Sequence, residues 1–177
     1  VGATSNDVTV SLDDVAAVPL RVEKSTSTPT LDEPGGTFSF SVDVTNDSTV
    51  DVATISDIDD NWAGDAPLTD SGSQDLQSSC VNAAGDAITF PYDLGTGETI
   101  TCTFTQDHFG NADDSWTDAV TVAATDDDGD DVGATSNDVT VSLDDVAAVP
   151  LRVEKSTSTP TLDEPGGTFS FSVDVTN

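Results

Sequence analysis

The sequence predicts an all-β protein in which an antiparallel β-sandwich is repeated in tandem. Apolar and polar residues alternate along several segments, and turns rich in Gly, Asp, Asn and Pro separate these segments. Alternation with a period of two is typical of a strand with one buried face and one solvated face. In addition, residues 1–46 return without a change as residues 132–177. A fixed period of 131 residues indicates a chain built from copies of one unit.

Seven segments carry the strand signal, and none has a convincing helical period. The clearest is 37–45, in which every second residue is Phe or Val and the residues between them are polar. The expected strands are 20–24, 37–45, 50–58, 87–90, 99–105, 114–125 and 139–143. Residues 66–79 are polar and would form a long loop. Seven short strands joined by such turns predict an immunoglobulin-like antiparallel β-sandwich.

The repeat also sets the expected domain boundaries. If the first strand starts near Leu20 and the last ends near Leu143, one complete repeat spans 18–148. Residues 1–17 would then be the last strand and linker of a preceding repeat, and residues 149–177 the first two strands of the next. We therefore expect this sequence to be a window onto a longer fibre. The strand in 1–17 would pair with a neighbouring repeat or with another molecule.

Carboxylates dominate the charge of the chain. There are 34 Asp and Glu residues against four Lys and Arg, which gives a formal net charge of −30. Such a surface repels nucleic acids and anionic membranes, and no apolar run approaches the roughly 18 residues of a membrane-spanning helix. Most of the acids are Asp, and short carboxylates on turns suit Ca²⁺, which we predict as the cofactor. A halophilic or merely solubilising surface would also be Asp-rich, and this alternative stays open.

The chain contains two cysteines, Cys80 and Cys102. An even number of cysteines in such a β-rich chain suggests a disulfide and an oxidising, extracellular setting, although two buried free thiols would give the same count. The single histidine, His108, offers too few soft ligands for zinc. It lies beside Gly110 in an expected turn, which favours a surface or loop position. No catalytic pattern stands out among so many carboxylates, so we expect no enzyme activity.

Two stretches resemble a known family. RVEKSTSTPTLDEPGGTFSFSVDVTN at 21–46 and LGTGETITCTFTQDHFGNADDSWTDAVTVAATDDDGDD at 94–131 resemble the tandem immunoglobulin-like repeat of large bacterial and archaeal surface proteins. The shared features are a Lys-bearing first strand, a Pro-Gly-Gly turn, a strand ending in Val-Thr-Asn, a Cys-bearing strand and a Thr-Asp-Asp-Asp-Gly turn. The resemblance implies a seven-stranded sandwich, export to the cell surface, a spacer or adhesive role, and a disulfide between Cys80 and Cys102. The identity between copies is also similar to the extender arrays of calcium-dependent adhesins.

The expected strand directions gather acidic turns at both ends of each sandwich. If the first and last strands run in the same direction, the turn at Asp32, the loop after the third strand and the linker after Leu143 share one end. The turns that follow residues 46 and 125 share the other end. Unpaired carboxylates packed this closely repel each other by on the order of 1–4 kcal/mol per pair, and Ca²⁺ removes that repulsion. We therefore expect calcium to bind where successive repeats meet.

Three Asp patterns supply the candidate ligands. The first, Asp126-x-Asp128-Gly129-Asp130, approaches the spacing of calcium loops, with a solvated Asp-Gly hairpin turn as the alternative. The second, Asp57-x-Asp59-Asp60 with Asp65 after Gly64, could form one cage in the expected loop after the third strand, where a plain polar loop is the alternative. The third is the linker pair Asp13–Asp14 and its copy Asp144–Asp145, with an acidic hinge as the alternative. The candidate metal ligands are Asp13, Asp14, Asp32, Asp57, Asp59, Asp60, Asp65, Asp126, Asp128, Asp130, Asp144 and Asp145.

These observations predict a structural role. The expected function is a component of an extracellular filament or of a surface adhesin stalk, made of identical repeats and stiffened by calcium. Its partners would be neighbouring repeats, with other filaments or a surface glycan as further partners. One alternative is a repeat that binds a ligand or glycan multivalently. Trp116 could stack on a sugar, but the alternation places it on an inward face, where we expect it in the core. The other is a non-covalent filament in which a strand of one subunit completes the next.

Overall fold

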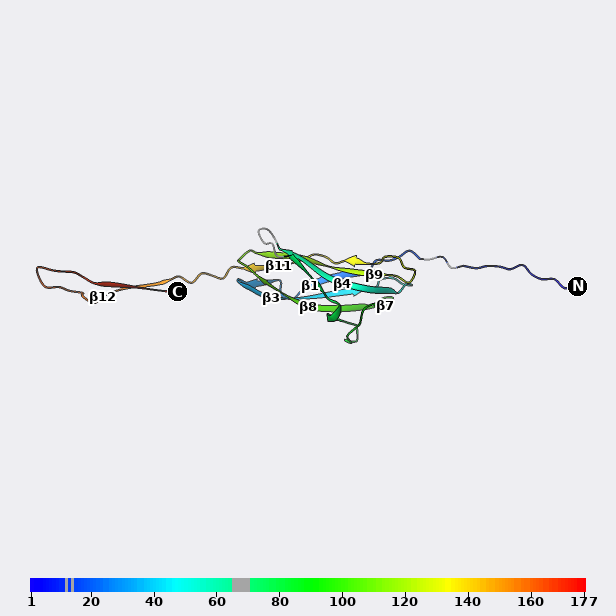
Figure 1. The fold of residues 1–177 in the computed structure, drawn as a ribbon, viewed down its shortest axis with the longest axis horizontal. Helices are drawn as coiled ribbons and strands as arrows, with labels where there is room; N and C mark the ends of the chain where they lie inside the picture. Colours follow the sequence, from blue (N-terminus) through cyan, green and yellow to red (C-terminus); the bar gives the residue numbers. More distant parts are fainter. Residues whose placement is uncertain (12, 14, 65–70) are drawn as a thin grey trace. The chain divides into compact units, whose positions relative to one another are not determined.

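Two β-sheets face each other in the computed structural model, which describes residues 1–11, 13, 15–64 and 71–177 (Figure 1). The first sheet has the order β1 (Arg21–Thr26), β3 (Gly35–Thr45), β8 (Thr99–Phe109), β6 (Cys80–Val81). The second has the order β2 (Thr30–Asp32), β11 (Val139–Asp144), β9 (Ser115–Thr125), β4 (Ala53–Gly64), β5 (Ser71–Asp75). In addition, β10 (Ala134–Thr135) pairs with β9, and β7 (Tyr92–Leu94) pairs with β4. The predicted fold class, an immunoglobulin-like β-sandwich, is confirmed.

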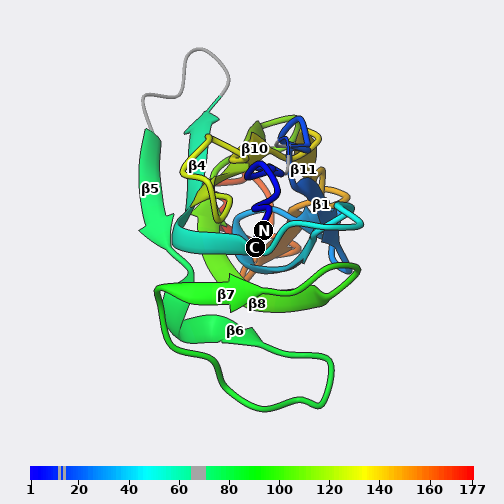
Figure 2. The ribbon, with the colours of Figure 1, turned by 90° about the vertical axis from the view of Figure 1, so that its right-hand side faces the viewer.

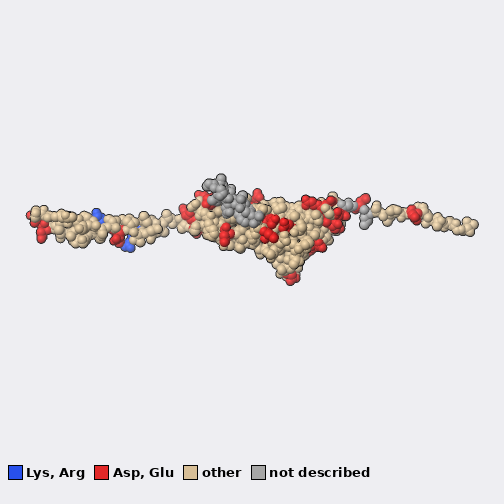
Figure 3. Space-filling view, viewed as in Figure 1, with Lys and Arg blue, Asp and Glu red and all other residues tan. Residues whose placement is uncertain are grey.

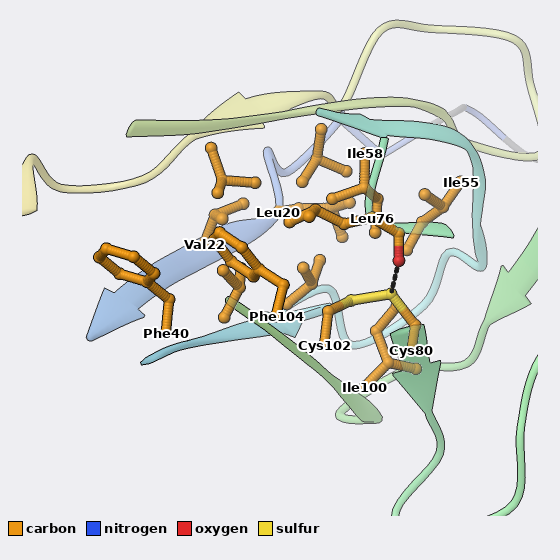
Figure 4. Packing of buried hydrophobic residues seen from close by; sticks show 14 of the residues in the cluster. Leu20, Val22, Phe40, Ile55, Ile58, Leu76, Cys80, Ile100, Cys102 and Phe104 are labelled. Atoms are coloured by element: carbon orange, nitrogen blue, oxygen red, sulfur yellow. Dashed lines mark hydrogen bonds between the residues drawn. A yellow bond between two sulfur atoms is a disulfide. The ribbon is translucent and has the colours of Figure 1, made fainter. Parts of the chain in front are cut away.

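Each sheet turns an apolar face toward the other, because the alternation in the sequence places every second side chain inward. β3 and β8 pair without a break from Gly35 opposite Phe109 to Thr45 opposite Thr99. The inward residues of β3 are at most 4% exposed: Phe38, Phe40, Val42 and Val44. Figure 4 shows how side chains from both sheets meet in this core. Each large apolar side chain buried there stabilises the fold by about 1.5–3 kcal/mol relative to an exposed one.

The start of the chain's first sandwich is divided between the two sheets. After β1 the chain crosses to the second sheet, where β2 runs parallel to β11 and Asp32 lies beside Asp144. The turn before β3 and the β8–β9 loop therefore meet the end of β11: Glu33 N donates to Asp144 O (2.9 Å), and Asp113 N donates to Leu143 O (2.8 Å). The sandwich thus gathers three acidic connections at one of its ends.

One predicted loop and one predicted strand are wrong. In the described part of 66–79, β5 and a short 3-10 helix, Gln77–Ser79, replace the expected long loop. The stretch 87–90 forms no strand, and the unpredicted strand β6 pairs with β8. The loop prediction failed because residues 71–79 are mostly polar in sequence, whereas Leu76 and Cys80 are buried and hold this segment to the core. Figure 2 shows the chain between β6 and β7 extending away from the sandwich, beyond the edge strand β6 of the first sheet.

Residues 146–177 form a second compact unit that contains one hairpin. Its strands, β12 (Arg152–Thr157) and β13 (Phe171–Thr176), pair in the register of β1 and β3, so that Lys155 lies opposite Val173 as Lys24 lies opposite Val42. The described residues of 1–17 form no strand, whereas their copies supply β10 and β11. The boundaries 1–17, 18–148 and 149–177 stay predictions. No helix among the described residues is long and apolar enough to cross a membrane.

Candidate functional site

Three carboxylates gather on the outer face of the second sheet. Asp59 lies directly opposite Asp75 in the β4–β5 pair, and Asp57 lies two residues before Asp59. Residues two apart in a strand share a face. One oxygen of each carboxylate lies within 4.8 Å of the other two. This is the one group of three such potential ligands found in the described parts of the chain.

The group is partly exposed, and its negative charges repel one another. Gln77 Nε2 donates to Asp57 Oδ1 (2.5 Å), and Gln77 N donates to Asp75 Oδ1 (2.8 Å). Partial burial, and then the charges of Asp57 and Asp75, raise the pKa of Asp59 above its usual value. A divalent cation would remove this repulsion. Three carboxylates plus water could supply the roughly six to eight oxygens that Ca²⁺ takes, so the residues present fit a hydrated cation.

The structure separates the ligands predicted around β4. Asp57 and Asp59 lie within the strand rather than in a loop after it, because β4 continues to Gly64. Asp60 follows Asp59 and so points to the opposite face, where it is 0% exposed. The expectation that Asp60 joins one cage with Asp57 and Asp59 is therefore wrong. Asp75 was not among the predicted ligands, because only the β4–β5 register brings it close to Asp59. Asp65 lies outside the described residues.

The Asp126–Asp130 turn uses its first carboxylate for its own backbone. Asp128 N and Asp130 N both donate to Asp126 Oδ1, at 3.1 and 2.8 Å. Gly129 has φ of 92°, the left-handed conformation that glycine adopts without steric cost. This geometry matches the hairpin-turn alternative. Within the described residues, the three carboxylates of this turn do not come together as a ligand group.

The other candidates lie near the ends of the sandwich. Asp32 and Asp144 are neighbours in the β2–β11 pair, and both are exposed, as are Asp13 and Asp145. Asp14 lies outside the described residues. A calcium-binding role of these residues between repeats stays a prediction. Figure 3 shows acidic side chains at many places on one face of the sandwich, as the net charge of −30 requires.

A lysine lies in the core between the two sheets. Lys24 of β1 has a fully buried side chain, and its Nζ lies 2.5 Å from Oδ1 of Asp60 on β4 and 2.5 Å from Oδ1 of Asp118 on β9. Nζ also lies 4.5 Å from the ring centre of Phe40 and 5.2 Å from that of Phe104. The side chains of Asp60 and Asp118 are 0% and 4% exposed. We call Lys24, Asp60 and Asp118 the buried lysine cluster.

Polar side chains of β8 line the same region. Gln106 Nε2 donates to Asp60 Oδ2 (2.5 Å), and Gln106 Oε1 lies 3.3 Å from Nε2 of His108. His108 is 2% exposed and stacks on Trp116 with ring centres 4.6 Å apart. The expected surface or loop position of His108 is wrong, because β8 continues to Phe109 and turns His108 inward. The core position expected for Trp116 is confirmed.

The buried lysine cluster shifts the protonation of one of its acids. Burial raises the pKa of Asp118 to about 6, while Lys24 lowers this pKa and the nearby Asp60 raises it. A pKa this close to neutrality means that protonated and ionised forms of Asp118 are both populated in the folded state. Perturbed acids beside a buried amine are typical of sites with chemical function, although ion pairs in cores produce them too.

Cys80 and Cys102 form a disulfide. The two residues lie opposite each other in the β6–β8 pair, and both are buried. Cys80 Sγ also lies 3.3 Å from the carbonyl oxygen of Leu76, which Figure 4 marks. The bond therefore ties the short edge strand β6 to the sheet. A disulfide of this kind indicates an oxidising, extracellular setting.

Comparisons with known proteins add little. No protein-family model matches the sequence, and no similar sequence was found among curated proteins. One similar solved structure is the CARDB domain of a Pyrococcus furiosus protein in complex with di-metal ions. It is 12% identical with a TM-score of 0.36, and the match covers 76% of this chain and 99% of that one. A likeness this weak carries no argument about function.

Proposed function

We propose that this chain belongs to a tandem array of immunoglobulin-like sandwiches that forms an extracellular filament or the stalk of a surface adhesin. The observation that carries the proposal is the unchanged return of residues 1–46 at 132–177. Each copy encodes the first two long strands of a sandwich, so the repeated unit is a structural domain rather than a short motif. Such an array suits a spacer, because each added copy adds length by stacking on its neighbour.

The β12–β13 hairpin supports this proposal through its exposed apolar residues. Val153, Phe171, Val173 and Val175 are 56–62% exposed, although the same residues of the first copy are buried. Two strands alone are marginally stable in water, and a contiguous exposed apolar face marks an interaction surface. The remaining strands of a second repeat would cover this face, as β4 and β9 cover β1 and β3 in the first sandwich.

Calcium would stiffen such an array in two places. At Asp57, Asp59 and Asp75 an ion would fix the edge strand β5 to β4 within one repeat. At the linker pairs Asp13–Asp14 and Asp144–Asp145, further ions would neutralise the carboxylates between repeats. Because an ion bound only to the folded state stabilises that state by mass action, chelation should soften the array.

Chains of one, two and four complete periods test this function. Small-angle scattering in calcium should show a maximum dimension that grows by ~40–50 Å for each added period, the length of one sandwich plus its linker. Excess EDTA should lower the stiffness of the four-period chain. A four-period chain that folds back into a compact particle in both conditions would contradict the filament, and equal rigidity in both would contradict the role of calcium.

A non-covalent filament is the second candidate, and the N-terminal segment favours it. Val8 and Val10 are 78% and 87% exposed, whereas their copies Val139 and Val141 lie in β11. A strand-forming segment with exposed apolar side chains can complete another subunit by strand addition. The mass of the native protein on a denaturing gel separates the two candidates. A band at the 18.2 kDa of this sequence would favour strand exchange, and a much larger band would favour covalent repeats.

A further inference from the structure

The buried lysine cluster is not required by the array. Its three ionisable side chains are at most 4% exposed, and they connect β1 of the first sheet to β4 and β9 of the second. Moving such charges out of water is costly, and a buried ion pair is often no better for stability than apolar side chains of the same size. A position where an amine and two carboxyl groups meet with at most 4% exposure to solvent needs another explanation.

We infer that Lys24 and Asp118 form an intramolecular amide bond, an isopeptide, with Asp60 as the group that moves the proton. Lys24 Nζ lies 2.5 Å from a carboxyl oxygen of each aspartate, so the nucleophile, the acid and the proton acceptor are already in contact. Holding reactants in this way is equivalent to effective molarities of roughly 10⁵–10⁸ M in favourable intramolecular reactions. No external enzyme is needed for a bond between groups placed so closely.

The reaction balances without an oxidant or a cofactor. Transfer of one proton from Lys24 Nζ to Asp118 gives a neutral amine and a protonated acid; the amine then attacks the side-chain carbonyl carbon of Asp118, and a C–N bond forms. The carboxylate of Asp60 accepts the proton that the nitrogen releases and passes it to the hydroxyl group of Asp118. The C–O bond to that hydroxyl breaks, and the hydroxyl leaves as one water molecule. Asp60 ends the step with the charge it had at the start.

The surroundings favour the protonated form of the acid. The rings of Phe40 and Phe104 lie 4.5 and 5.2 Å from Lys24 Nζ and help to exclude water. Loss of water favours the uncharged form of a carboxyl group over its charged form. Burial raises the pKa of Asp118 to about 6, so part of this carboxyl is protonated near neutral pH. The same core that makes the ion pair costly therefore promotes the covalent step.

The two aspartates differ in their roles because their contacts differ. Gln106 Nε2 donates to Asp60 Oδ2 at 2.5 Å, which orients the other oxygen of Asp60 toward Lys24. Asp118 is the acid whose protonated form burial favours, so it supplies the hydroxyl that leaves. A Lys24–Asp118 bond would tie β1 to β9 across the core. That such a bond would help the sandwich to resist pulling forces rests on the proposed array. The formation of the bond does not depend on the array.

The intact mass of the whole chain tests the inference after its disulfide has been reduced. The mass should be lower than the mass of the sequence by one water molecule. Protease digestion and tandem mass spectrometry should then find one branched peptide that joins Lys24 to Asp118. A folded chain with the full mass would overturn the inference, and a branch at Asp60 would overturn the assignment of roles.

Variants give a sharper result. Asp118→Asn can react with Lys24 by releasing ammonia instead of water, so this variant and the wild type should reach the same final mass. Lys24→Arg keeps the positive charge but should retain the full mass of its sequence. Lys155→Arg, the same change in the exposed copy, is the matched control and should still lose one water. Loss of water by Lys24→Arg would overturn the inference.

Asp60→Asn tests the proton transfer. If Asp60 moves the proton, this variant should form the bond at least roughly 100-fold more slowly, while circular dichroism shows a folded sandwich. An unchanged rate would remove Asp60 from the mechanism. If a variant fails to fold, the branched peptide of the wild type still decides. None of these masses depends on calcium or on the number of repeats, so the bond and the array can fail separately.

Discussion

The two copies of the first hairpin have the same pairing and different surroundings. β1–β3 and β12–β13 share one sequence and one register. Yet Phe40 is 4% exposed and its copy Phe171 is 59% exposed. The comparison indicates that strand pairing in this repeat is encoded within the hairpin. Burial of its apolar face requires the second sheet.

The lysines of the two hairpins also share the contacts within the hairpin and differ in the contacts that the second sheet supplies. Lys24 and Lys155 lie over the adjacent Phe rings at 4.5 and 4.4 Å from the ring centres. The second sheet then adds Asp60 and Asp118 to the surroundings of Lys24, whereas Lys155 is exposed. The chemistry inferred for Lys24 is therefore a property of the complete sandwich.

The largest expected difference between the copies is in the core. Phe40→Ala should lower the free energy of unfolding of the sandwich by about 3–5 kcal/mol, because it removes a buried ring and leaves a cavity. Phe171→Ala should leave that free energy nearly unchanged, since Phe171 is exposed. Urea titrations of both variants measure the difference. Equal destabilisation would mean that the second hairpin is buried in solution.

The disulfide should contribute the next largest effect. The disulfide closes a loop between residues with a sequence separation of 22, and replacing both Cys80 and Cys102 by Ser opens this loop. The double replacement should therefore lower the free energy of unfolding by about 3 kcal/mol. The same titration reports it, with the reduced wild-type chain as a control for the added hydroxyl groups. An unchanged midpoint would show that β6 is held by Leu76 and its neighbours without the bond.

Lys24→Met should make the stability depend on pH in a defined direction. This variant cannot form the amide, and it removes the group that lowers the pKa of Asp118, which burial raises from 3.8. The folded state then keeps a proton that the unfolded state releases, so stability falls as pH rises through the window between the two pKa values. The loss should be roughly 1–3 kcal/mol between about pH 4 and about pH 7.

Urea titrations across this range test the prediction. The double variant Lys24→Met, Asp118→Asn has no acid at this position and should show a shallower profile. Lys155→Met should follow the wild type, because Lys155 has no buried acid beside it. Identical profiles for the single and the double variant would contradict the raised pKa of Asp118.

The smallest effect should change sign with calcium. Without divalent ions, Asp59→Asn removes repulsion from Asp57 and Asp75 and should stabilise the sandwich by up to about 1 kcal/mol. In saturating calcium it removes a ligand and should reduce the stabilisation that the ion gives. Thermal unfolding with and without calcium measures both, with exposed Asp138→Asn as the matched control. One sign in both conditions would count against a cation at this group.

Alternation predicted the sandwich well, since apolar residues recur at every second position along most of its long strands. The same alternation also places Lys24 and Asp118 of the buried lysine cluster at inward positions. Lys24 continues the inward series of Leu20 and Val22, and Asp118 lies between the inward residues Trp116 and Val120. Both were missed because a charged residue on a strand favours a solvated position unless its partner is known, and these partners lie on other strands.

The acidic group could be predicted in part. Asp57 and Asp59 are candidates because they are close in the sequence, but the polar residues after Ile58 also suggested that the strand had ended. Asp75 could not be added, because the β4–β5 register that places it opposite Asp59 depends on Leu76 reaching the core. A contact that depends on the burial of another residue, here Leu76, leaves little trace in the sequence around the contacting residues.

Amide hydrogen exchange, read residue by residue, tests most directly whether the second hairpin awaits the rest of its sandwich. In the 177-residue chain the amides of β13 should exchange at least roughly tenfold faster than those of β3, because the apolar side chains of β13 are 56–60% exposed. When the chain is extended by the sequence of residues 47–148, which completes the second repeat, the two strands should exchange at similar rates. Equal protection before the extension, or a difference that persists after it, would contradict the account.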